Sequence, residues 1–281
     1  MANFTAADVK KLCELTAAGM MDCKNALVEA DGDFDKAAEI LRVKGLKGVT
    51  KREGRSASNG LVAAQLDGTT SGVLFELNCE TDFVAKGERF QQVAERLVAH
   101  IAATSPADVE AFLASELEAG TTVQSFVDEA NATLGEKIEV RRFAQLGGDD
   151  KFVAAYLHKT SPDLPPQVGV LVELSGSGDL SEVAKDLAQH IAALPPVYVT
   201  REEVPADVVE NERRLAEATA REEGKPEQAI AKITEGRVNG FFKDNVLVEQ
   251  SFAKDQKKTV KSILEGAGAT VHRFARYRVG S

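Results

Sequence analysis

The segment Leu61-Val62-Ala63-Ala64 returns as Phe152-Val153-Ala154-Ala155 at an offset of 91 residues. A second match follows at an offset of 90, between His100-Ile101-Ala102-Ala103 and His190-Ile191-Ala192-Ala193. Two matches at nearly the same offset indicate one unit that occurs twice in the chain. The sequence therefore predicts a duplicated core. A segment that only one copy contains is a candidate for function rather than for folding.

The first copy contains such a segment after its second expected strand. Gly72-Val73-Leu74 aligns with Gly169-Val170-Leu171 at an offset of 97, which then falls to 90, so the first copy holds seven more residues. At this place Asn78–Lys86 reads Asn-Cys-Glu-Thr-Asp-Phe-Val-Ala-Lys. The second copy turns with Gly176–Asp179, which contains no aromatic residue.

The second copy contains a longer insertion. Thr122-Val123 pairs with Thr259-Val260 at an offset of 137, which places about 47 extra residues after Ala193. Their pattern predicts two helices, at 207–223 and 227–239, with Gly ending the first helix and Pro starting the second. We expect a helical hairpin at 204–239 that is inserted in the second copy.

This hairpin has little apolar surface to bury. Its seam consists of Val208, Leu215, Ile230 and Ile233. A partner or a second subunit could cover the seam, or the hairpin could be a solvated arm, and the sequence does not decide between the two.

Each copy reads as strand, hairpin, strand, helix, helix and strand. This order predicts an α+β fold with small antiparallel sheets rather than a doubly wound sheet. We place the first core repeat at 56–148 and the second at 149–281. The elements expected in the first repeat are strands at 61–66, 72–78 and 137–146 and helices at 91–104 and 123–132.

Residues 1–46 predict a compact unit of three short helices. Thr5 and Asp8 have the spacing of a capping box, and Asp33 can cap the third helix, which we expect to end at Gly45. Asp31-Gly32-Asp33 also matches the start of a calcium loop, but Arg42 stands where the closing Glu is required, so we interpret it as a turn. The basic, Gly- and Ser-containing segment 44–59 predicts a flexible linker, and the first domain is placed at 1–55.

Composition excludes several classes of function. The chain of 281 residues has 44 acidic and 34 basic residues and a net charge of −10, which disfavours nucleic acid and anionic membrane as main partners. The basic linker leaves contact with phosphate or RNA as a minor alternative. Without a leader or a long apolar run, the sequence predicts a cytoplasmic protein. Three cysteines without CxxC spacing predict neither a disulfide framework nor a metal site.

Nothing in the sequence predicts covalent catalysis. His100 and His190 occupy the same place in both copies, so a structural role explains them better than an active site. Motifs of hydrolases, P-loops and zinc enzymes are missing from the sequence. Cys79 adjoins Glu80, whose charge raises a thiol pKa, so a reactive thiolate is not expected. We therefore expect no enzyme, no cofactor and no catalytic residue.

The single-copy segment allows two interpretations. Asp82 could cap the next helix while Phe83 packs in the core, or Phe83 could be presented outward beside the carboxylate. The second copy builds the same turn without an aromatic residue, which favours outward presentation.

Two separated stretches of the chain resemble the bacterial translation elongation factor Ts family. They are Gly19–Lys24, which reads Gly-Met-Met-Asp-Cys-Lys, and Asn78–Lys86. Shorter matches at Glu235-Gly236-Arg237 and Glu249–Phe252 extend the resemblance over essentially the whole chain.

The resemblance implies a guanine-nucleotide exchange factor for the GTPase elongation factor Tu, without direct binding of nucleotide by this chain. It implies that the N-terminal unit is similar to a ubiquitin-associated domain and docks on the GTPase domain. The partner-binding residues carried over are Met20, Met21 and Lys24 in this unit, and His158 in the second repeat, which contacts another domain of the partner.

The resemblance also assigns an exchange wedge, which consists of Thr81, Asp82, Phe83 and Val84. Asp82 and Phe83 would insert between helices of the GTPase domain and disturb the magnesium and phosphate end of its nucleotide site. The helical hairpin would be a coiled coil, and a homodimer or a 2:2 complex with the partner is left open.

Two departures from the family pattern limit what is carried over. Ser251 replaces the usual Pro, and no C-terminal helical extension follows Ser281, so its contacts are not predicted. A rival interpretation is an adaptor that associates with the ribosome or with nascent chains through its N-terminal helices, which the basic linker mildly favours. The single-copy Asp82-Phe83 pair favours nucleotide exchange.

Overall fold

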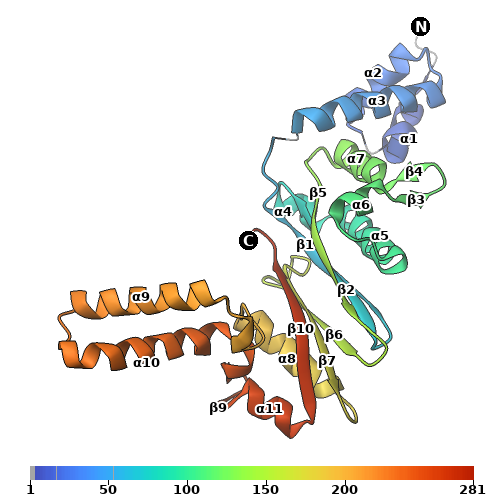
Figure 1. Cartoon of the computed structure of the whole chain (residues 1–281). Coiled ribbons are helices and arrows are strands. Elements are labelled where there is room, and N and C mark those ends of the chain that lie inside the picture. Colours follow the sequence, from blue (N-terminus) through green and yellow to red (C-terminus); the bar gives the residue numbers. More distant parts are fainter. Residues whose placement is uncertain (1–3, 17, 53) are drawn as a thin grey trace.

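The structure is a computed structural model that describes residues 4–16, 18–52 and 54–281. Figure 1 shows an N-terminal group of helices, two small sheets with helices against them, and a long helical hairpin that projects from the second sheet's side of the molecule. The predicted α+β class with small antiparallel sheets is confirmed. No helix in the described part of the chain has both the length and the apolar character needed to cross a membrane.

The N-terminal unit consists of the helices α1 (Ala6–Thr16), α2 (Met20–Glu29) and α3 (Phe34–Arg52). The capping box before α1 is present, since Asp8 N donates to Thr5 Oγ1 over 3.3 Å and Thr5 N donates to Asp8 Oδ2 over 2.7 Å. Asp33 caps α3 as predicted, because its Oδ1 accepts from Lys36 N at 3.0 Å. The three helices share their own apolar cluster, separate from the core clusters of the two repeats.

The predicted end of the third helix at Gly45 is wrong. The backbone of α3 remains helical to Arg52, through most of the segment that we expected to be a flexible linker. A glycine inside a helix costs only about 1 kcal/mol, and tertiary packing can outweigh that cost. Here α3 packs on α7 (Val123–Leu134) of the first repeat, and Arg52 Nη1 donates to the carbonyl oxygen of Asn131 over 3.1 Å.

The first repeat is a three-stranded antiparallel sheet in the order β1-β2-β5, covered by helices. Its strands are β1 (Asn59–Asp67), β2 (Ser71–Cys79) and β5 (Glu139–Gly147), and its main helices are α4 (Asp82–Lys86), α5 (Glu88–Thr104) and α7. The sequence predicted the succession of strand, hairpin, strand, helix, helix and strand along the chain, in which α5 and α7 are the two helices. It did not predict the sheet order, α4, the short α6 (Val109–Ala114) or the small hairpin of β3 (Glu116–Glu118) and β4 (Thr121–Thr122).

The second repeat repeats the arrangement with the sheet order β10-β7-β6. Its strands are β6 (Phe152–His158), β7 (Val168–Gly176) and β10 (Ala269–Arg278), and its helices are α8 (Ser181–Ala193) and α11 (Val260–Gly266). The remaining short elements are η1 (Arg201–Glu203), η2 (Leu247–Glu249), β8 (Ser251–Phe252) and β9 (Asp255–Thr259).

The two sheets meet through a buried apolar cluster that draws on both repeats. Gly72 and Gly169, which aligned in the sequence, explain how the sheets approach so closely. A Cβ atom at Gly72 would lie 3.0 Å from Leu171 Cδ1, and one at Gly169 would lie 2.4 Å from Val62 Cγ1. Both copies therefore need a residue without a side chain at this position.

An ion pair with a buried carboxylate shows that the alignment of the copies holds at the level of side chains. Glu76 Oε2 accepts from Arg142 Nε over 2.6 Å in the first repeat. Glu173 Oε1 accepts from Arg273 Nε over 3.2 Å in the second, at the aligned positions. Both repeats therefore contain the same ion pair between a Glu carboxylate and an Arg guanidinium.

The helical hairpin is formed by α9 (Ala206–Glu222) and α10 (Glu227–Asn245), which lie side by side (Figure 1). Its expected boundary at 239 is wrong, because α10 continues to Asn245. The expected seam is wrong in one member, since Leu215 is 43% exposed. The apolar pattern also did not predict that small residues let the helices approach, since Ala216 and Ala220 are buried in α9.

Candidate functional site

The predicted wedge lies on the short helix α4, which packs on the core of the first repeat. Thr81 is the N-cap of α4, and its Oγ1 accepts from Val84 N over 3.3 Å. Val84 and Ala85 are buried in the core cluster of the first repeat. A helix of five residues has little stability of its own, so its position depends on these contacts.

Phe83 points away from this core and is 83% exposed. The interpretation in which Asp82 caps the helix and Phe83 packs inside is therefore wrong, because Thr81 provides the cap. Asp82 is exposed, and its Oδ2 lies 2.9 Å from Lys86 Nζ, which lowers the pKa of the carboxyl. The turn thus presents an apolar ring beside a carboxylate that stays ionised at neutral pH.

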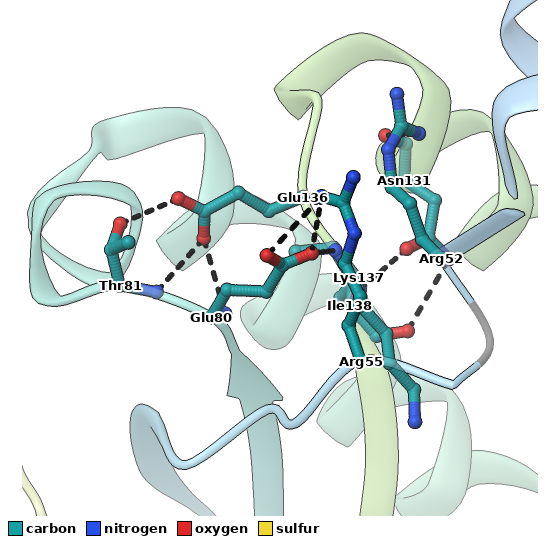
Figure 2. A network of polar contacts seen from close by, with 8 residues as sticks. All are labelled: Arg52, Arg55, Glu80, Thr81, Asn131, Glu136, Lys137 and Ile138. Carbon is teal, nitrogen blue, oxygen red and sulfur yellow. Dashed lines mark hydrogen bonds and ion pairs between the residues drawn. The ribbon is translucent and has the colours of Figure 1, made fainter.

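The carboxylate of Glu136, in the turn between α7 and β5, holds the start of this helix (Figure 2). Its Oε2 accepts from the backbone N–H groups of Glu80 and Thr81, over 3.1 and 3.0 Å. Its Oε1 accepts from the hydroxyl of Thr81 over 2.6 Å. One side chain therefore satisfies three donors at the point where the chain leaves β2 and enters α4.

The carboxylate of Glu80 makes the reciprocal contact. Its Oε1 accepts from the backbone N–H of Lys137 over 2.7 Å, which lowers the pKa of the carboxyl. Arg55 adds Nη1 contacts of 3.3 and 3.4 Å to the two oxygens of the same carboxylate. Asn59 Nδ2 donates to the carbonyl oxygen of Glu80 over 2.8 Å. We call the reciprocal contacts of Glu80 and Glu136 the carboxylate brace.

Cys79 lies under the turn and is unsuited to nucleophilic chemistry. Its Sγ is 3.1 Å from the carbonyl oxygen of Thr81, to which the thiol donates. Burial raises the pKa of this thiol to about 12, and the charge of Glu136 adds to the effect. The thiol is therefore protonated at neutral pH, as predicted, but the cause is burial with the charge of Glu136 rather than the charge of Glu80.

Comparisons with known proteins identify the family of the chain. The family model described as Elongation factor TS matches residues 80–281, which include the wedge and the brace. The chain belongs to the elongation factor Ts family. Elongation factor Ts of Streptomyces griseus is 64% identical over 281 residues, covering all of both chains. Those of Thermobifida fusca and Nocardia farcinica are 60% and 58% identical, over all of this chain and 99% of each relative.

The other residues carried over from the elongation factor Ts resemblance lie on elements apart from the wedge. Met20 and Met21 begin α2, and their side chains are 75% and 65% exposed. Lys24 is exposed on the same helix. His158 ends β6 in the second repeat, where its Nδ1 lies 3.1 Å from the hydroxyl of Tyr156. The structure therefore does not gather them into one site with the wedge.

Across residues 4–16, 18–52 and 54–281, no group of three or more His, Cys, Asp or Glu side chains is arranged to hold a metal ion. The Asp31-Gly32-Asp33 segment forms a turn, with Asp31 and Gly32 at positive φ angles of 53° and 86°.

The brace was not predicted from the sequence, although a signal for it is present there. Glu80 lies inside the single-copy segment, and Glu136 lies in the turn before the last strand of the same repeat. By the offsets of the flanking strands, Glu80 aligns with Ser177 and Glu136 with Ala267. Two carboxylates that are absent from the second copy could have been noticed as a pair.

Proposed function

We propose that the protein is a guanine-nucleotide exchange factor that binds elongation factor Tu and promotes release of GDP during translation elongation. The observation that carries this proposal is the exposure of Phe83 on a short capped helix that the second repeat lacks. Membership in the elongation factor Ts family supports it. An exposed aromatic side chain held by a rigid base is suited to insertion into a partner.

In the proposed mechanism, Asp82 and Phe83 insert between helices of the GTPase domain and disturb the magnesium and phosphate end of its nucleotide site. A thousandfold loss of nucleotide affinity requires about 4 kcal/mol of coupling, and the nucleotide weakens binding of the factor equally. Burial of one Phe side chain contributes roughly 1.5–3 kcal/mol. Insertion of the wedge can therefore supply much of this coupling.

The remaining surfaces would hold the complex together while the wedge acts. We propose that α1–α3 form a unit similar to a ubiquitin-associated domain and dock on the GTPase domain through Met20, Met21 and Lys24. His158 would contact another domain of elongation factor Tu, and α9 and α10 would wind as a coiled coil. The chain would act in the cytoplasm. It would need no cofactor, metal or bound nucleotide of its own, because nucleotide exchange breaks no covalent bond.

The rival adaptor function receives less support from the structure than from the sequence. The basic linker mildly favoured this adaptor, which would act through the N-terminal helices. Both arginines of that segment contact protein groups, since Arg52 donates to Asn131 O and Arg55 to the Glu80 carboxylate.

The proposal is tested by release of fluorescent GDP from elongation factor Tu. We expect the parent chain to accelerate release, and the Asp82→Ala/Phe83→Ala variant to lose at least about tenfold of this acceleration at saturating concentration. Leu194→Ala is a matched control, because it also truncates an exposed apolar side chain but lies at the end of α8. A double variant that releases GDP as fast as the parent would show that the wedge assignment is wrong.

A further inference from the structure

The orientation of Phe83 depends on groups outside the wedge. Phe83 follows the N-cap Thr81 by two residues, and the carboxylate of Glu136 binds both the backbone N–H and the hydroxyl of Thr81. In the opposite direction, the carboxylate of Glu80 accepts a hydrogen bond from the backbone N–H of Lys137, which lies in the same turn as Glu136. Two turns far apart in the sequence are thus joined by charge-assisted hydrogen bonds in both directions, which are stronger than neutral ones.

The second repeat shows that the fold does not need these carboxylates. There Ser177 aligns with Glu80 and Ala267 with Glu136, and Gly268 aligns with Lys137. The two turns come together directly through their backbones, since a Cβ atom on Gly176 would lie 2.5 Å from the carbonyl oxygen of Gly268. In the first repeat the carboxylates of Glu80 and Glu136 bridge the turns instead. The brace is therefore specific to the copy that carries the wedge.

The brace also reaches the N-terminal unit. Arg55 follows α3 closely in the chain and contacts both oxygens of the Glu80 carboxylate. At the end of α3, Arg52 donates to the carbonyl oxygen of Asn131 in α7. The side chain of Asn131 donates to the carbonyl oxygen of Ile138, next to Lys137. Both arginines are therefore connected through hydrogen bonds to the turn that contains Glu136 (Figure 2).

We propose that Glu136 and Glu80 are positioning residues that hold Phe83 in the orientation needed for nucleotide exchange, and that Arg55 links this orientation to the N-terminal docking unit. The proposal rests on the proposed exchange function. Glu136 contributes the larger effect, because it satisfies three donors of the wedge turn. Arg55 contributes a smaller effect, because an ion pair with a half-exposed arginine is worth little.

The first test measures the free protein and does not depend on exchange activity. Hydrogen–deuterium exchange of the peptide that covers 79–86 is compared in the parent, Glu136→Ala, Glu136→Gln and Glu118→Ala. We expect amide exchange in this peptide to rise at least about tenfold in Glu136→Ala, because the Glu80 and Thr81 amides lose their acceptor. Glu118→Ala is the control, since it removes a carboxylate of the same repeat that pairs with Arg96 outside the wedge.

Glu136→Gln distinguishes positioning from charge and keeps the test sound if the alanine variant folds poorly. The amide oxygen of Gln still accepts from the two backbone N–H groups, and its NH2 group can donate to Thr81 Oγ1. We therefore expect most of the protection of residues 79–86 to return in this variant. Unchanged amide exchange in Glu136→Ala would overturn the proposal at once.

The second test measures GDP release from elongation factor Tu. For Glu136→Ala we expect the rate at saturating factor to fall about tenfold, which corresponds to about 1.4 kcal/mol, while the half-saturating concentration changes by less than about threefold. Arg55→Ala should lower the saturated rate about twofold. A saturated rate equal to that of the parent, with residues 79–86 deprotected, would overturn the positioning role. Failure of the exchange function itself would appear differently, as a parent chain that does not accelerate release.

Discussion

The hydrogen bonds of His190 fix its imidazole in one neutral form. Nδ1 accepts from the backbone N–H of Ala253 over 3.1 Å, so Nε2 carries the proton and donates to Gln250 Oε1 over 2.8 Å. The side chain is 1% exposed, and burial lowers its pKa. Protonation of Nδ1 would place two donors against each other. His190 is thus a structural residue of the second repeat, as its repetition at His100 predicted.

This arrangement predicts a pH dependence of stability. The folded-state pKa lies below the ordinary value of about 6.5, so the unfolded chain binds a proton first as pH falls. The unfolding free energy should therefore fall by up to about 1.4 kcal/mol per pH unit below about pH 6.5, and the contribution should vanish above it. His190→Gln should lose this contribution, because Gln does not titrate.

Urea unfolding of the parent and of His190→Gln at about pH 7.5 and about pH 5.5 measures the effect. Burial also lowers the pKa of His100, but that residue is present in both proteins, so the difference between them isolates His190. If the difference in unfolding free energy between the parent and His190→Gln is the same at both pH values, the imidazole of His190 is protonated in the folded protein.

At the scale of elements, the duplication predicted more of the fold than local patterns did. Repeated segments such as those at Leu61 and Phe152 predicted the same succession of strands and helices in both copies, because a repeat constrains two copies at once. Local signals failed where packing outweighed them. Gly45 predicted a helix end, but contact with α7 extends α3, and the apolar pattern placed Leu215 in a seam that Ala216 and Ala220 occupy.

The base of the hairpin belongs to the body of the protein, whereas its distal part does not. Val204, Val238 and Phe242 form a buried cluster with Val246 at the base. Farther out, Arg213 Nη1 and Glu235 Oε2 face each other across the two helices at 3.3 Å. A short turn can therefore join the helices at this level.

We predict that replacing 214–234 with a Gly/Ser turn leaves the melting temperature within a few degrees of the parent's, because the base cluster is kept. Replacing 204–239 should lower it clearly, because Val204 and Val238 are lost from the cluster and α10 is cut before Phe242. Thermal unfolding followed by circular dichroism distinguishes the two variants. Equal melting temperatures for both replacements would show that the base cluster does not support the body.

At the scale of the whole molecule, the N-terminal unit has its own apolar core but is not an independent appendage. Its helices bury Leu12, Leu27 and Ala37 among themselves, so the repeats keep their cores when the unit is removed. Its connection to the wedge runs through Arg52 and Arg55. The sequence could predict the unit from its caps and helical spacing. It could not predict this connection, which depends on contacts between residues far apart in the chain.

Two deletions separate docking from positioning. Removal of residues 1–50 keeps both arginines, whereas removal of 1–55 eliminates them. We expect both deletions to raise the dissociation constant for elongation factor Tu about tenfold or more, because the proposed docking surface with Met20 and Met21 is lost. At saturating concentration, the first deletion should release GDP at nearly the parent rate.

The second deletion should release GDP more slowly at saturation, by about twofold or more, since Glu80 loses its arginine partner and α7 loses the Arg52 contact. Titration by calorimetry gives the dissociation constants, and stopped-flow release of fluorescent GDP gives the saturated rates. Circular dichroism of both truncated chains checks that the repeats remain folded. An unchanged dissociation constant would show that α1–α3 do not dock on the partner. Equal saturated rates for the two deletions would show instead that docking and wedge orientation are independent, because the only difference between them is the segment that reaches the brace.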